Sequence, residues 1–190
     1  MELNDLLDLV RGGDELAWEA FVRRFQGRVF GLAYQYLGNP EDARDLAQEA
    51  FVRVYQNLPR MPQEEFLLPW LLTITRNASL DQLRRRKARP QGGDLPVEEL
   101  FALSSPGPNP EQQHLEWARK SQVHQALGEL TGLNRELILL KEIHGLTLED
   151  IARMLEVPLG TVKSRSHRAR LELAEKLTAL GAGPAARVSG

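Results

Sequence analysis

The most informative pattern in the chain is TLEDIARMLEVPLGTVKSRSHRARLEL, residues 147–173. Thr147 and Asp150 have the spacing of a capping box, which predicts that a short helix begins there. Residues 156–158 then interrupt the helical pattern, and a second helix is expected from about Leu159. The apolar residues expected to pack are Leu148, Ile151, Ala152 and Leu155 on the first helix and Val162, Ala169 and Leu173 on the second. The segment therefore predicts a helix-turn-helix.

The second of these helices is strongly basic. No acidic residue stands between Lys163 and Arg170. In DNA-binding helix-turn-helix proteins the first residues of the second helix point into the major groove, where lysine and arginine pair with guanine edges. A helical hairpin whose basic residues are simply solvated is the alternative, and the capping box, turn and unbroken charge together favour DNA binding. The candidate DNA-contacting residues are Thr161, Lys163, Ser164, Arg165, His167 and Arg168.

Upstream of this motif, residues 90–113 have the composition of a flexible linker. They hold five of the eleven prolines and three glycines, which cannot sustain a long helix or a central strand. On both sides of the linker the apolar residues recur every three or four positions, and no convincing strand pattern is found. The expected fold class is therefore all-α, with two small helical domains joined by a flexible linker.

In the N-terminal half, Asn39-Pro40-Glu41-Asp42 is a typical helix start, and that helix should run to about Leu58. A helix pair is expected from Pro69 to roughly Arg86, broken or bent near residues 77–79, because Asn and Ser compete for backbone hydrogen bonds. Residues 76–89 contain six basic residues and one acid. Aromatic residues nearby, with this charge, are typical of proteins that bind single-stranded nucleic acid.

Composition excludes several function classes. The 190 residues include no cysteine and four histidines without metal-ligand spacing, so no metal site, cofactor or catalytic residue is expected. Glu64-Glu65 and Glu98-Glu99 are adjacent acids on expected loops and do not suit an enzyme with paired carboxylates. No apolar run is long enough for a membrane span, and the acidic N-terminus is unlike a signal peptide. A cytoplasmic protein that is not an enzyme is expected.

Three segments in this order resemble a bacterial extracytoplasmic-function (ECF, group IV) RNA polymerase sigma factor. They are DARDLAQEAFVRVYQNL (42–58), WLLTITRNASLDQLRRRKAR (70–89) and GLTLEDIARMLEVPLGTVKSRSHRAR (145–170). The resemblance implies a transcription initiation factor that binds core RNA polymerase, recognises the minus-ten and minus-thirty-five promoter elements and assists promoter opening. It also implies a sigma-2-like domain over residues 1–89, the linker 90–113, a sigma-4-like domain over 114–177 and a loose tail over 178–190.

The resemblance assigns roles to individual residues. It implies that the beta-prime coiled coil of the polymerase is bound by Asp45, Gln48, Glu49 and Arg53. Helical spacing independently puts the first three of these on the side of the helix opposite its apolar face. Asn77 would sit in a loop that captures a flipped base. The minus-ten DNA contacts implied are Trp70, Arg76, Asn77, Arg84, Arg85 and Arg86, and the minus-thirty-five contacts are the six residues given above for the helix-turn-helix. The implied partners are core polymerase (beta-prime coiled coil and beta flap), promoter DNA and an anti-sigma factor, without membrane insertion.

One alternative of another class shares the C-terminal motif. A helix-turn-helix regulator that acts without polymerase would use the same basic helix. Such a protein needs a receiver or a ligand pocket, and a receiver would show alternating strands and helices with acids at strand ends. The N-terminal half shows neither feature. Polymerase binding therefore distinguishes the two hypotheses.

Overall fold

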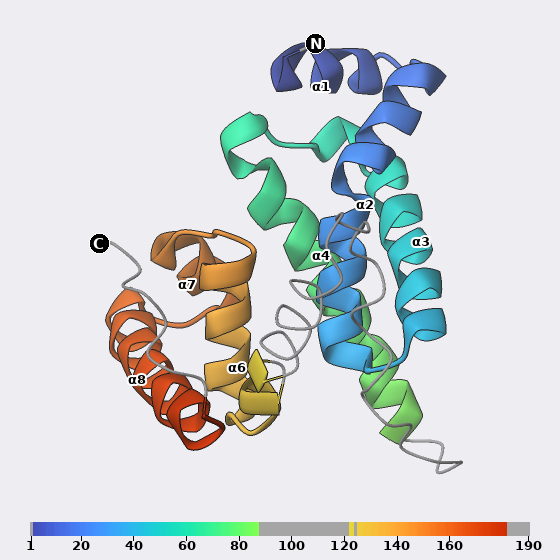
Figure 1. The fold of residues 1–190 in the computed structure, drawn as a ribbon. Helices are drawn as coiled ribbons and strands as arrows, with labels where there is room; N and C mark the ends of the chain where they lie inside the picture. The colour runs from blue at the N-terminus through green and yellow to red at the C-terminus, as the bar shows by residue number, and fades with distance from the viewer. Residues whose placement is uncertain (1, 88–121, 124, 182–190) are drawn as a thin grey trace, which may run out of the picture. The chain divides into compact units, whose positions relative to one another are not determined.

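The computed structural model describes residues 2–87, 122–123 and 125–181, and it divides into an N-terminal and a C-terminal unit (Figure 1). All the regular structure in these ranges is helical, which confirms the all-α prediction. The whole predicted linker (90–113) and residues 182–190 of the predicted tail lie outside the described residues. No helix within the described part of the chain is long and apolar enough to cross a membrane.

The N-terminal unit is built around α2 (Glu15–Leu37), which packs against α1 (Leu3–Arg11), α3 (Pro40–Gln56) and α4 (Glu64–Lys87). In Figure 1 α2, α3 and α4 run beside one another as a bundle. Its core includes a large cluster in which aromatic residues of α2 and α3 meet leucines of α1 and α4. The fully buried members include Leu7, Phe21, Val29, Ala50, Val54 and Leu71.

The α2–α3 corner follows from local sequence. Gly38 ends α2 in the left-handed conformation (φ 69°), which glycine adopts without steric cost. Asn39 then caps α3, because its Oδ1 accepts from the N–H groups of Glu41 (2.8 Å) and Asp42 (3.1 Å). The predicted start of this helix is confirmed. α3 ends at Gln56, and a 3₁₀ turn over Leu58–Arg60, η1, continues the chain toward α4.

The predicted helix pair after Pro69 is wrong: α4 is one helix from Glu64 to Lys87, with Pro69 inside it. The hydroxyls thought to favour a break bond within the helix instead. Thr75 donates to the carbonyl of Leu71 (2.9 Å), and Ser79 donates to that of Thr75 (2.9 Å). Both hydroxyl residues are fully buried. Packing of this face therefore keeps the helix continuous at residues 77–79.

The C-terminal unit contains α6 (Gly132–Ile138), the π-helical segment η3 (Leu139–Ile143), α7 (Leu148–Leu155) and α8 (Leu159–Ala179). Residues 125–128, also helical, precede them. α8 packs against both α6 and α7, and its Ala169 joins leucines 127, 130 and 139 in the core. Asn134 of α6 also donates to a carboxylate oxygen of Glu172 on α8 (2.6 Å). α8 is therefore held along its length by helices on one side.

The helix-turn-helix forms as the sequence predicts. The Thr147 hydroxyl accepts from the Asp150 N–H (3.0 Å), and the Asp150 carboxylate accepts from the Thr147 N–H (3.3 Å). Glu156 closes α7 in the left-handed region (φ 56°), which costs a non-glycine residue free energy. The apolar face of α7 differs from the prediction: Ile151 and Met154 are buried, whereas Leu148, Ala152 and Leu155 are only partly buried.

Candidate nucleic-acid and partner interfaces

The exposed side of α3 carries the predicted polymerase-docking residues. Asp45, Gln48 and Glu49 are exposed, while Leu46, Ala47 and Ala50 between them are buried. The helical period of 3.6 residues produces this separation. Arg53, one turn later, forms an ion pair with Glu49 and is half-buried. The structure thus brings the four residues together on one helix face.

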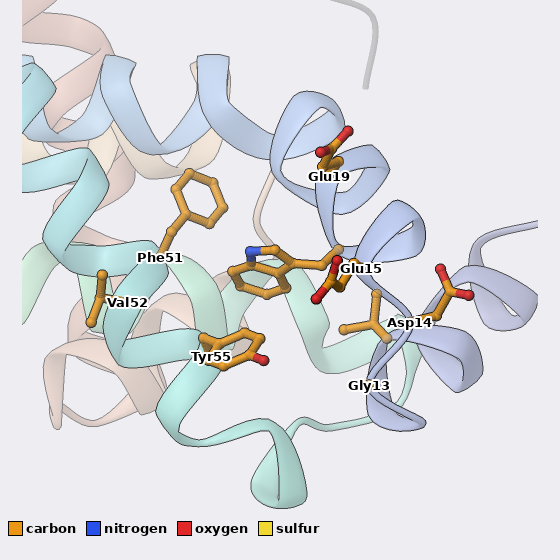
Figure 2. Close-up of a pocket in the computed structure, with 9 residues that line it drawn as sticks. Gly13, Asp14, Glu15, Glu19, Phe51, Val52 and Tyr55 are labelled. Carbon is orange, nitrogen blue, oxygen red and sulfur yellow. The ribbon is translucent and has the colours of Figure 1, made fainter.

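A groove of about 450 Å³ lies at the C-terminal end of that face (Figure 2). Phe51, Val52 and Tyr55 line it from α3, and the α1–α2 turn and the start of α2 supply acidic residues on the opposite side. Val52 and Tyr55 are each 54% exposed, a large fraction for apolar side chains. The acidic residues are Asp14, Glu15 and Glu19. The groove therefore combines an apolar floor with a negative rim.

Trp18 of α2 also lines the groove. Its ring lies 5.0 Å from that of Tyr55 and 5.4 Å from that of Phe21, measured between centroids. Edge-to-face and stacked rings of this kind fix each other's orientation. The groove could not be predicted from the sequence, because its lining residues come from two segments, 10–19 and 51–55, that are more than thirty positions apart. One signal was available: Val52 and Tyr55 follow Gln48 at helical spacing on the exposed face.

On α4 two of the six predicted minus-ten contacts, Asn77 and Arg84, lie on one stripe with Phe66. Phe66, Thr73, Asn77 and Arg84 are seven, four and seven residues apart, so they share one side of the helix, whereas Arg86 lies on the side that contacts Asp42 of α3. Phe66 is 41% exposed and Asn77 is exposed, whereas Trp70 is half-buried against the core. The prediction that Asn77 lies in a loop is wrong, because it stands in the middle of α4. Arg76 is half-buried and already makes interactions within the protein.

The basic end of α4 is partly neutralised by carboxylates. Arg84 pairs with Asp81 of the same helix (3.1 Å), and Arg86 pairs with Asp42 in the first turn of α3. Arg85, between them, is exposed and forms no ion pair with any described residue. Three arginines that look equivalent in the sequence therefore differ in the structure.

On α8 the predicted DNA-reading residues all lie away from the core. Lys163, Ser164, Arg165, His167 and Arg168 are exposed, and Thr161 is half-buried. Val162, Ser166 and Ala169 are buried and hold the opposite face against the domain. No side chain caps the first turn of α8, which Pro158 precedes. The Thr161 N–H donates to the Pro158 carbonyl (2.9 Å), which leaves the N–H groups of Leu159 and Gly160 for an external acceptor. This arrangement suits binding to the phosphates of a nucleic acid backbone.

Little else in the described ranges suggests chemistry. No three histidine, aspartate or glutamate side chains gather there in a way that could hold a metal ion. Burial raises the pKa of the Tyr34 phenol above its ordinary value of 10.0, and its hydroxyl donates to the carbonyl of Gly38 (3.2 Å). This tyrosine lies at the end of α2 and supports the α2–α3 corner.

Two family models match the chain, one over each structural unit. The model of sigma-70 region 2 matches residues 21–89, and that of sigma-70 region 4 matches residues 120–173. The first covers α3, α4 and α2 from Phe21 onward, and the second covers the helix-turn-helix. Both matches fall on the surfaces described above.

Curated relatives extend the similarity to most of the chain. An RNA polymerase sigma-H factor of Pseudomonas aeruginosa is 31% identical over 87% of this chain and 88% of its own length. The ECF RNA polymerase sigma factor SigW of Bacillus subtilis is 30% identical, with coverage of 93% and 97%. The ECF factor SigE of Mycolicibacterium smegmatis is 39% identical over 87% of this chain, which spans 64% of that longer protein.

Solved structures show the same fold. The sigma factor RpoE of Bartonella quintana, crystallised with the anti-sigma factor NepR, matches with a TM-score of 0.65 at 25% identity, covering 84% of this chain and 96% of that one. CnrH, solved with the cytosolic domain of CnrY, matches with a TM-score of 0.62 at 24% identity, covering 93% and 97%.

Proposed function

Because the chain belongs to the ECF RNA polymerase sigma factors, which act in transcription initiation, we propose that it works through a protein-binding surface on α3 and DNA-binding surfaces on α4 and α8. The same proposal includes three further points. The chain belongs to group IV of these factors, it acts in the cytoplasm, and it catalyses no reaction of its own. The proposal also includes the division into a minus-ten domain (1–89), a linker (90–113), a minus-thirty-five domain (114–177) and a tail (178–190).

The observation that carries the proposal is the continuity of the α3 face with the aromatic groove. Asp45, Gln48 and Glu49 lead along one stripe to Val52 and Tyr55. Exposed aromatic and aliphatic residues surrounded by polar ones are typical of protein–protein interfaces. The acidic rim fits a partner segment that is apolar with basic flanks. We assign this surface to the beta-prime coiled coil of core polymerase, with Arg53 positioning Glu49 through their ion pair.

The stripe on α4 is proposed to hold the single-stranded minus-ten element. Phe66 stands eleven residues before Asn77, about 16 Å along a helix that rises 1.5 Å per residue. Asparagine offers a donor and an acceptor to a base edge, and flipping one base out of a melted region costs only a few kcal/mol. Arg84, Arg85 and Arg86 would hold phosphates, while Trp70 and Arg76, both half-buried, would support the surface from its edge.

The first turns of α8 are proposed to read the minus-thirty-five element in the major groove. Lys163 and Arg168 can reach base edges, while Thr161, Ser164 and the N-terminal amides suit phosphate oxygens. Arg165 and His167 lie at the sides of the same exposed surface. Lys163 and Arg168 are the residues expected to determine sequence preference.

Two further partners complete the proposal. The beta flap of the polymerase is expected to contact the C-terminal unit. An anti-sigma protein is expected to hold the free factor inactive, in line with the co-crystal of the Bartonella relative with NepR.

Run-off transcription on a library of promoter fragments tests the proposal. Purified bacterial core polymerase should start at specific promoters only when the chain is added. Gln48→Ala and Tyr55→Ala should weaken binding to core, whereas Lys163→Ala should leave core binding intact and abolish specific starts. Gln26→Ala, an exposed glutamine on α2, is the control for Gln48→Ala.

Core binding can be followed with one reporter that only this chain carries. Of the three tryptophans, Trp18 lies in the groove, so a Trp70→Phe, Trp117→Phe variant grown with 5-fluorotryptophan has a single ¹⁹F label there. Its ¹⁹F NMR signal should shift or broaden when unlabelled core polymerase is added. If the chain binds duplex DNA but neither binds core nor directs a start, the proposal is wrong and the regulator hypothesis replaces it.

A further inference from the structure

The ion pair between Asp42 and Arg86 joins the helix that faces the polymerase to the helix that faces DNA. Asp42 lies in the first turn of α3, with its backbone N–H bonded to the Asn39 side chain (3.1 Å). Arg86 lies in the last turn of α4, and its Nη2 contacts Oδ2 of Asp42. The pair therefore connects residues 44 positions apart at the edge of the basic cluster.

Each member of this pair is also favoured by its own helix. A carboxylate at a helix N-terminus and a guanidinium at a helix C-terminus both interact favourably with the helix dipole. Yet the pair remains accessible, because the Arg86 side chain is 41% exposed and that of Asp42 is 31% exposed. Water and an incoming phosphate can thus reach the guanidinium, and an exposed pair of this kind is weak enough to be displaced.

We propose that Asp42 is a built-in competitor for DNA phosphate at Arg86, which lowers the affinity of the free factor for the single strand. The proposal rests on the proposed role of the α4 basic end in binding that strand. A phosphate that engages Arg86 must displace the Asp42 carboxylate or bind beside it against like-charge repulsion. Either way, part of the attraction between arginine and phosphate is lost.

The geometry favours competition over pre-positioning of Arg86 for DNA. The Asp42 carboxylate contacts Nη2, one of the terminal guanidinium nitrogens that a phosphate would also bind, so the two anions compete for the same atom. Arg84 is also held by a carboxylate, that of Asp81, while Arg85 pairs with no described residue. Negative charges are therefore placed beside two of the three arginines proposed to bind phosphate.

The test measures binding of the full chain to a fluorescent oligo-dT strand, because phosphate contacts do not depend on base sequence. Asp42→Asn keeps the side-chain shape and removes the charge. It should tighten binding about two- to fivefold, the range expected for removing one exposed ion pair. The slope of log K against log salt should also steepen by up to about 0.7, the value of one additional phosphate contact on a single strand.

Two further variants make the result specific. Glu41→Gln removes a charge from the same turn of α3, next to Asp42, and should change binding less. Arg86→Gln should weaken binding, and adding Asp42→Asn to it should have no more effect than Glu41→Gln. Thermal unfolding of each variant controls for the loss of a charge that also stabilises the start of α3.

The outcomes separate this inference from the proposed function. If Arg86→Gln weakens oligo-dT binding while Asp42→Asn leaves it unchanged or weakens it, the competitor role is wrong and the DNA-binding role of α4 stands. If neither Arg86→Gln nor a combined change of Arg84, Arg85 and Arg86 to glutamine affects binding, the proposed role of α4 itself is overturned.

Discussion

The two helices proposed to bind nucleic acid, α4 and α8, present their arginines in different settings. On α4, Arg84 and Arg86 are paired with carboxylates, one from the same helix and one from α3. On α8, no acid occurs from Leu159 to Leu171, and the basic residues there pair with no described carboxylate. A count of charges along the sequence therefore overstates the positive field at the end of α4 and represents that at α8 correctly.

This difference in charge pairing matches the nucleic acid that each helix is proposed to bind, a single strand at α4 and a duplex at α8. An unpaired basic face gives strong, salt-dependent attraction to duplex phosphates, which helps the initial encounter with a promoter. A partly neutralised face holds a single strand less tightly and leaves discrimination to Phe66 and Asn77. Weak binding at α4 therefore makes strand capture depend on base contacts more than on charge.

The largest expected effect tests whether α4 is continuous, on which the comparison depends. Asn77→Pro should lower the free energy of unfolding of the N-terminal domain by about 3 kcal/mol or more, because proline inside a helix removes a hydrogen bond and clashes with the preceding turn. Chemical denaturation measures this loss. Asn77→Ala is the control and should change stability little, since alanine is a better helix former. Tolerance of proline would restore the predicted break near residues 77–79.

The next effect compares the helices directly. Lys163→Ala or Arg168→Ala should weaken binding to a minus-thirty-five duplex by about 1–3 kcal/mol, if either contacts a base edge. Arg84→Ala should weaken binding to a single strand by less than about 1 kcal/mol, because Asp81 already offsets its charge. Both losses are measured by titration at one fixed salt concentration. Equal losses at the two sites would remove the distinction between them.

How far the sequence predicts the molecule depends on whether a feature is local. The capping box of Thr147 and Asp150, the start of α3 and its exposed face all follow from residues within two turns of each other, and all are confirmed. The predicted break in α4 is wrong because the buried hydroxyls of Thr75 and Ser79 bond to carbonyls of their own helix. Propensity alone does not include the packing that selects this arrangement.

Features of the candidate interfaces that combine distant segments could not be predicted. The groove joins the α1–α2 turn to the end of α3, and the Asp42–Arg86 pair joins α3 to α4. Nothing in the periodicity of a single helix indicates which helix lies beside it. The individual residues were visible in the sequence, but their neighbours were fixed only by the tertiary fold.

A smaller effect concerns how the helix-turn-helix is held. Thr147→Ala removes the capping hydroxyl from α7 and should destabilise that helix by about 1 kcal/mol. Hydrogen exchange of residues 148–155, measured by mass spectrometry, should speed up, while exchange in α3 stays the same. The charges of α8 are untouched, so duplex binding should fall only as far as the domain loosens. A loss of binding without faster exchange would instead place Thr147 at the DNA.

The smallest expected effect separates the turn from the charges that it presents. Glu156 holds a left-handed conformation that glycine adopts without steric strain, so Glu156→Gly should raise the stability of the C-terminal domain by about 0.5–1 kcal/mol. Glu156→Gln keeps the strain, removes the charge and serves as the control. If the negative charge of Glu156 repels phosphate near α8, both variants should tighten duplex binding equally, whereas only the glycine variant should be more stable. A stability gain with glutamine as large as that with glycine would show that charge, and not backbone strain, is the cost of this residue.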